Sequence, residues 1–125
     1  MIHHVQLSAP AGSEAAARAF WSGMLGLDEV EKPPALAARG GCWFRGHGLE
    51  VHVGIDDNFF PARRAHPGFL VDGLDTWAAR LEKGGQPVEW DDRFPGMRRF
   101  YAADPFGNRL EFLELKRAER LADAR

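Results

Sequence analysis

The feature that most constrains this chain is an internal repeat. The same order of expected elements, strand–helix–strand–strand–strand, occurs twice at an offset of about 62 residues. At this offset His4 corresponds to His66, and Glu50 corresponds to Glu111 at an offset of 61. The intervals agree as well, because 46 residues separate His4 from Glu50 and 45 separate His66 from Glu111. We therefore predict an α+β fold built from two copies of one βαβββ unit.

The first copy is expected to begin with a strand over Ile2–Ser8, where polar and apolar residues alternate. Ser13 is expected to cap a helix over the following AAARAFWSGML, which Gly26 would end. Three further strands are expected, at Leu27–Glu31, Gly41–Arg45 and Leu49–Ile55.

The second copy repeats this order after a stretch of turn and charged residues without periodicity. The expected elements are a strand over His66–Val71, a helix over Leu74–Lys83, and strands over Pro87–Trp90, Arg99–Ala103 and Arg109–Leu115. Residues 1–125 are thus expected to form a single domain of two modules, about 1–57 and 66–115. The linker would be 58–65, and residues 116–125 would be a charged, helix-prone tail that frays.

Composition excludes several classes of function. A net charge of −2 gives no general attraction to nucleic acid, and no apolar run approaches the roughly 20 residues of a membrane helix. The N-terminus lacks the basic stretch and apolar core of a signal peptide, and the single cysteine cannot form an internal disulfide. These features predict a cytoplasmic protein whose partner is a small molecule, not nucleic acid or a membrane.

The polar members of the repeat would share one face of each sheet. In Leu49–Ile55, Glu50 and His52 lie opposite the apolar residues, and in Arg109–Leu115 Glu111 lies opposite Leu110 and Phe112. Apolar neighbours can pack under helices, which leaves the polar residues on the concave side. A partly buried carboxylate must be paired or must bind a metal. Two histidines and two glutamates in one cup suit a divalent first-row ion such as zinc, nickel, manganese, iron or cobalt.

Four segments resemble a known family. They are HHVQL in the first strand, AFWSGMLGL at the end of the first helix, HPGFLVDGLD at the start of the second module, and ADPFGNRLEFLE at its end. Together they make the chain similar to the vicinal-oxygen-chelate superfamily of glyoxalase I, bleomycin-resistance proteins, extradiol dioxygenases and fosfomycin-resistance proteins. The resemblance implies paired βαβββ modules around a metal-centred cup, commonly in a homodimer.

The resemblance also implies metal ligands. In glyoxalase-like members these come from the first and last strands of each module, which gives His4, Glu50, His66 and Glu111. Three-ligand members would use His4, His66 and Glu111. His52, two residues beyond Glu50 on the same face, is an alternative to Glu50 as the fourth ligand.

Other residues are candidates for contact with a substrate. Trp43 and Trp90 are the tryptophans expected to line a pocket, and Arg99 could hold an anionic group by two hydrogen bonds. Tyr101 alternates with Arg99 and is a candidate proton donor, while Glu50 or Glu111 is the candidate general base.

The leading functional hypothesis is a glyoxalase-like metalloenzyme, a lyase or an oxidoreductase, in which the metal chelates two neighbouring oxygens of a small substrate. A metal-free protein that sequesters a drug-like molecule, as bleomycin-resistance proteins do, is the alternative. A three-ligand enzyme of the extradiol-dioxygenase or fosfomycin-resistance type is another. The sequence does not choose the substrate.

Overall fold

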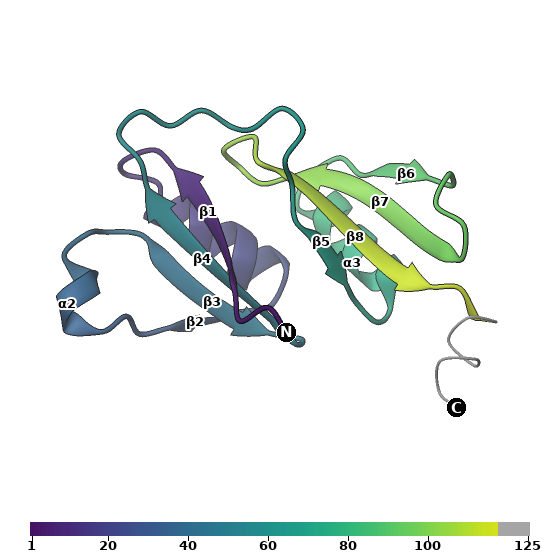
Figure 1. Ribbon diagram of the computed structural model, residues 1–125, viewed down its shortest axis with the longest axis horizontal. Helices are drawn as coiled ribbons and strands as arrows, with labels where there is room; N and C mark the ends of the chain where they lie inside the picture. The colour runs from purple at the N-terminus through teal and green to yellow at the C-terminus, as the bar shows by residue number, and fades with distance from the viewer. Residues whose placement is uncertain (118–125) are drawn as a thin grey trace.

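A computed structural model describes residues 1–117, and the expected tail beyond them lies outside the described residues. These residues form two similar modules that lie side by side (Figure 1). The first module contains β1 (Val5–Ala9), α1 (Glu14–Arg18), the π-helix η1 (Ala19–Met24), β2 (Asp28–Val30), α2 (Pro34–Ala37), β3 (Cys42–Gly46) and β4 (Leu49–Ile55). The second contains β5 (Gly68–Leu70), α3 (Leu74–Lys83), β6 (Glu89–Asp91), β7 (Met97–Ala103) and β8 (Arg109–Leu115).

The two sheets have the same topology, which confirms the predicted pair of βαβββ modules. Their strand orders are β1-β4-β3-β2 and β5-β8-β7-β6. In each sheet the first strand runs parallel to the last, and the remaining pairings are antiparallel. A parallel pairing needs a long crossover, and here the crossover includes the helix of each module.

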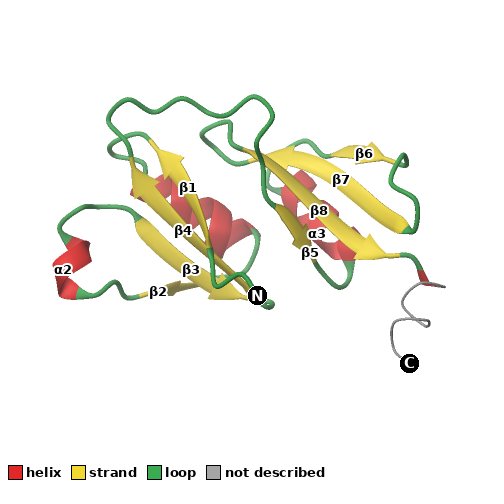
Figure 2. Ribbon diagram, viewed as in Figure 1, coloured by secondary structure: helices red, strands yellow, loops and turns green. Residues whose placement is uncertain are grey.

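Each sheet has one face covered by helices and one open face (Figure 2). On the covered side, Val51 and Val53 of β4 and Leu110 and Phe112 of β8 are almost fully buried. Phe112 packs its ring against Phe69, Trp77 and Phe100. Because strand residues alternate between faces, Glu50, His52 and Glu111 lie on the open faces, as the alternation predicts.

The two modules are joined through their helix-covered sides and by one turn. The rings of Trp21 and Phe69 lie 6.2 Å apart across the boundary between modules. Asn108, in the turn before β8, donates its side-chain amide to the Ser8 carbonyl of β1 at 2.8 Å. No helix within residues 1–117 has the length and apolar character to cross a membrane.

The predicted first helix lies where it was expected, but its second half is a π-helix instead of an α-helix. After Arg18 the backbone hydrogen bonds span five residues instead of four, and the Leu25 amide donates to the Phe20 carbonyl five residues earlier. Ala17, Phe20 and Trp21 are buried, whereas the neighbouring Ala16 is exposed. Ser13 stands at the N-cap position, but its side chain makes no capping hydrogen bond.

Candidate functional site

The open face of the first module holds Glu50 between an arginine and a histidine. Arg45, its partner across the β3–β4 pair, donates Nε to Glu50 Oε1 at 2.7 Å. His52 Nε2 lies 2.8 Å from Glu50 Oε2. The hydrogen bond from Arg45, followed by that from His52, lowers the pKa of Glu50 to about 2. Glu50 is therefore a carboxylate throughout the physiological pH range.

His52 is enclosed in a stack of rings. It is 4% exposed, and its ring is parallel to Trp43 at 4.0 Å and to His4 at 3.9 Å between centroids. Burial lowers the pKa of His52, against the opposing hydrogen bond to Glu50. His4 precedes β1 and is exposed, with its Nδ1 3.0 Å from His3 Nδ1.

The open face of the second module holds a histidine–carboxylate pair. His66 Nε2 lies 2.8 Å from Glu111 Oε1, although 45 residues separate them in sequence. His66 Nδ1 lies 2.6 Å from the Arg64 carbonyl, which can only accept, so Nδ1 carries a proton. Glu111 is 7% exposed, and its second oxygen, Oε2, accepts from Arg99 Nη1 at 3.0 Å.

The Arg99 guanidinium that binds Glu111 is also bound by a second carboxylate. It donates Nε and Nη2 to Asp91 Oδ1 at 3.2 and 3.1 Å, so it bridges two carboxylates. Tyr101, opposite Glu111 in the β7–β8 pair, lies under the Arg109 guanidinium at 4.2 Å. Hydrogen bonds from Arg93 hold the pKa of Asp91 well below its usual range, with Arg99 contributing.

The strand register shows which residues of the two modules are structurally equivalent, and the result differs from counting residues along the chain. Gln6, two residues after His4, pairs with His52, whereas Gly68, two residues after His66, pairs with Glu111. His52 is therefore the structural counterpart of Glu111, although counting residues along the chain matches Glu50 to it. The difference arises because loops between the strands differ in length, and such loops alter residue counts without altering register.

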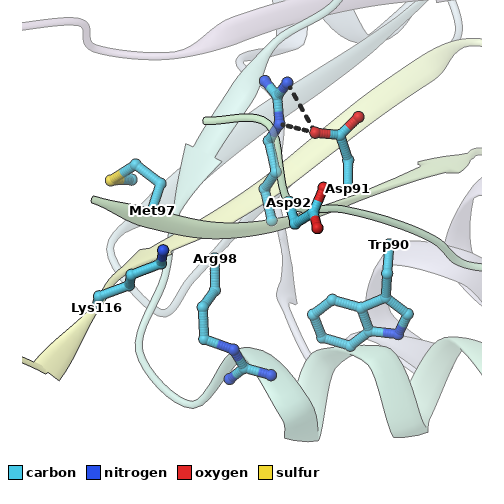
Figure 3. Close-up of a pocket in the computed structure, with 7 residues that line it drawn as sticks. Trp90, Asp91, Asp92, Met97, Arg98 and Lys116 are labelled. Carbon is cyan, nitrogen blue, oxygen red and sulfur yellow. Dashed lines mark hydrogen bonds and ion pairs between the residues drawn. The ribbon is translucent and has the colours of Figure 1, made fainter. Parts of the chain in front are cut away.

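Trp90, expected to line the pocket, lies on the other side of the second sheet from Glu111. It pairs with the buried Phe100, and its ring is 5.2 Å from the ring of Phe100. Figure 3 shows Trp90 and Arg98 pointing toward a helix, away from Asp91. These residues contribute to a hollow of about 370 Å³ that is separate from the histidine–carboxylate pair.

Two hollows contain the candidate histidines. One, of about 640 Å³, is lined by the first-module cluster of His4, Trp43, Glu50 and His52. The other, of about 470 Å³, contains His66. Gln6 lines both hollows. Among residues 1–117, the one set of three or more ligand-type side chains with all donor atoms within 4.8 Å is His3, His4 and Glu50. Among residues 1–117, these candidate ligands thus lie in two separate sets.

Several residues that contact these two sets are absent from the sequence-based candidates. Arg45 and Asp91 orient the candidate groups, and Gln6 lies between the hollows. A sequence signal existed for Arg45, because a hairpin around Gly46-His47-Gly48 brings it opposite Glu50. Asp91 carries no such signal, since the loop that joins β6 to β7 sets its position.

The fold and the site define a class of protein: small paired βαβββ modules that carry histidine and carboxylate groups on the open faces of their sheets. Residues 1–112 match the model of the Glyoxalase/Bleomycin resistance protein/Dioxygenase superfamily, and the chain belongs to this superfamily. It matches none of the curated proteins.

Solved structures agree with this assignment. A glyoxalase family protein from Bacillus anthracis is 48% identical over 93% of this chain and 95% of its own, with a TM-score of 0.88. The fosfomycin resistance protein FosX from Listeria monocytogenes is 18% identical over 96% of this chain and 97% of its own (TM-score 0.73). TnmS3, an antibiotic binding protein from Streptomyces sp. CB03234, is 22% identical over 93% and 98% (TM-score 0.68). The last two show likeness of fold.

Proposed function

We propose that this protein is a glyoxalase-like metalloenzyme that acts on a small substrate with two neighbouring oxygens. The observation that carries this proposal is the His66–Glu111 pair. His66 Nδ1 donates to the Arg64 carbonyl, and His66 Nε2 lies 2.8 Å from Glu111 Oε1, so one nitrogen and one oxygen are close enough to bind the same ion. Two ligands of one first-row ion, with bonds of about 2.0–2.2 Å, lie about 3 Å apart at a right angle. The donor set therefore fits a divalent metal.

The residues proposed to hold the metal are His4, Glu50, His66 and Glu111. Between Glu50 and His52 we favour Glu50, because the parallel rings of His4 and His52 cannot both direct their nitrogens at one ion. His52 would instead orient Glu50 through their 2.8 Å hydrogen bond, as groups behind a metal ligand commonly do. Zinc, nickel, manganese, iron or cobalt would suit this set. When bound, such an ion acts as a Lewis acid that polarises oxygen atoms of the substrate.

The general base is proposed to be Glu111. An efficient base has a pKa near the working pH, and Arg45 lowers the pKa of Glu50 to about 2, which makes Glu50 a weak base. Arg99 holds Glu111 Oε2 and leaves Oε1 directed at His66. Tyr101, opposite Glu111 on β7, is the proposed proton donor.

A homodimer is proposed to complete the site. One chain keeps the His4 cluster and the His66–Glu111 pair in separate sets, so a second copy is the simplest way to bring a complete set together. Large apolar side chains are also exposed, including Ile2, Phe60, Leu70 and Phe94. Exposed apolar surface commonly marks an interface between proteins.

Metal content tests this function. Protein purified without chelator is expected to carry a transition metal, and His66→Ala is expected to lose it while retaining its circular dichroism spectrum. Less than about a tenth of an equivalent of metal in the wild-type protein would overturn the proposal.

One observation favours a second candidate, a metal-free protein that binds a small molecule. Each candidate carboxylate already has an arginine partner, Arg45 for Glu50 and Arg99 for Glu111, so neither needs a metal to balance its charge. The fold likeness to the antibiotic binding protein TnmS3 is consistent with this function. Ligand binding that a chelator leaves unchanged, in protein that carries no metal, would identify this alternative.

A further inference from the structure

The hollow of the first module is lined by three stacked rings. The rings of Trp43, His52 and His4 lie nearly parallel, with angles of 6° and 16° between neighbours. The next position across the sheet from Trp43 is Val30 of β2, so no further ring continues the stack on that side. A planar ring of a ligand can extend such a stack at spacings of about 4 Å.

The same hollow carries an excess of positive charge. Its charged lining residues, with the histidines taken as neutral, are Lys32, Arg39, Arg45 and Glu50, three basic against one acidic. Glu50 is already paired with Arg45. Lys32 donates to the Gly40 carbonyl at the edge of the hollow. The Arg39 side chain has no ion-pair partner among residues 1–117.

The short helix α2 positions one of these basic residues, Arg39, beside the hollow. It contributes Leu36 to the lining of the hollow, and Arg39 follows in the turn after it. An apolar side chain and a free guanidinium thus stand within one hollow of about 640 Å³ that also contains the ring stack. This volume suits a small ligand.

We infer that this hollow binds planar aromatic anions, with the ligand ring stacked on the free face of Trp43 at the end of the Trp43–His52–His4 stack and the acidic group paired with Arg39 and Lys32. The inference rests on the proposed function and names its substrate class. An arginine can hold a carboxylate or sulfonate by two hydrogen bonds. Glu50, a proposed metal ligand, lines the same hollow, so a ligand bound here would lie beside the metal site.

The test uses the full chain after treatment with chelator, so that its outcome does not depend on a metal. Isothermal titration calorimetry with 2-naphthoate is expected to give a Kd below about 1 mM. The uncharged analogue 2-naphthamide and the non-aromatic cyclohexanecarboxylate are expected to bind at least about tenfold more weakly. Equal affinity for 2-naphthoate and either analogue would overturn the inference, as would no binding of 2-naphthoate at about 10 mM.

Matched variants locate the binding. Arg39→Gln is expected to weaken 2-naphthoate about tenfold and leave 2-naphthamide unchanged, and Arg39→Lys to restore part of the loss. Trp43→Leu is expected to weaken both naphthalenes, whereas Trp43→Phe retains a ring and most of the affinity. Arg63→Gln, an exposed arginine outside the hollow, is the control. An equal effect of Arg63→Gln and Arg39→Gln would place the anion elsewhere and overturn the inference.

Failure here differs from failure of the metalloenzyme proposal. A protein that carries metal but does not prefer 2-naphthoate contradicts only the substrate class. A protein that carries no metal but binds 2-naphthoate through Arg39 contradicts only the metalloenzyme.

Discussion

At the scale of single residues, each candidate carboxylate is held in a similar way in the two modules. Glu50 lies between Arg45 and His52, and Glu111 lies between Arg99 and His66. In both cases the arginine binds one oxygen and the histidine the other. The arginines thus fix the direction in which each carboxylate can present its remaining electron pairs.

The ion pair of Glu50 predicts how stability depends on pH. The pKa of Glu50 is about 2 in the folded protein and near 4.5 ordinarily, so its contribution to stability is present above about pH 4.5 and is lost as the pH falls toward 2. We expect Glu50→Gln to lose less Tm than the wild type between pH 5 and pH 2.5, measured by circular dichroism. Glu31→Gln, at an exposed position, is the control. Parallel curves for wild type and Glu50→Gln would contradict the assignment.

Arg99 predicts an effect on metal affinity. Because Arg99 orients Glu111, Arg99→Met is expected to weaken binding of Mn²⁺ or Zn²⁺ by about 10- to 100-fold, the usual effect of removing a group behind a ligand. The matched control is Arg93→Met, since Arg93 also pairs with Asp91 but has no bond to Glu111. Titration calorimetry measures the affinities. Equal losses in the two variants would mean that Arg99 acts through Asp91 alone.

At the scale of elements, strands and helices with regular periodicity were predicted well, whereas short or irregular helices were not. The bounds of β4, β8 and α3 agree with the predicted ranges, because alternation and helical spacing are unbroken there. The helix α2 was missed, since Pro33-Pro34 reads as a break although proline is tolerated in the first turn of a helix. The change from α1 to η1 has no sequence signature of its own, because a π-helix uses the same residue types.

Ser13 provides a test at this scale. Replacing a capping serine with alanine usually costs about 1 kcal/mol, because a helix amide loses its acceptor. Here the Ser13 hydroxyl is buried and has no hydrogen-bond partner among the described residues, so Ser13→Ala is expected to raise the free energy of unfolding slightly or leave it unchanged. Urea unfolding measures the difference. A loss near 1 kcal/mol would show that the hydroxyl caps the helix in solution.

At the scale of the whole molecule, the repeat predicted two modules but could not predict how they meet. Residue counts along the chain matched Glu50 with Glu111, whereas the strand register matches His52 with Glu111. Which side chains converge depends on how the modules pack and on contacts such as Asn108 to Ser8. These contacts join residues 100 positions apart, and no local pattern encodes them.

The proposed dimer predicts complementation between two inactive variants. If each site combines the first module of one chain with the second module of its partner, His4→Ala and His66→Ala each destroy both sites of their own homodimer. In a mixed dimer the two changes fall in one site and leave the other intact. A mixed dimer isolated through two different affinity tags is therefore expected to bind about one metal ion per dimer, measured by mass spectrometry of metals.

The control is a mixed dimer of His66→Ala with Glu111→Ala. Both changes lie in the second module, so each of its two sites contains one damaged module, and no ion should bind. If each site instead lay within one chain, every chain in either mixed dimer would carry a damaged site and both mixtures would be empty. Metal in the first mixture and none in the second is thus an outcome that only a shared site produces. It requires the His4 cluster of one chain to meet the His66–Glu111 pair of the other.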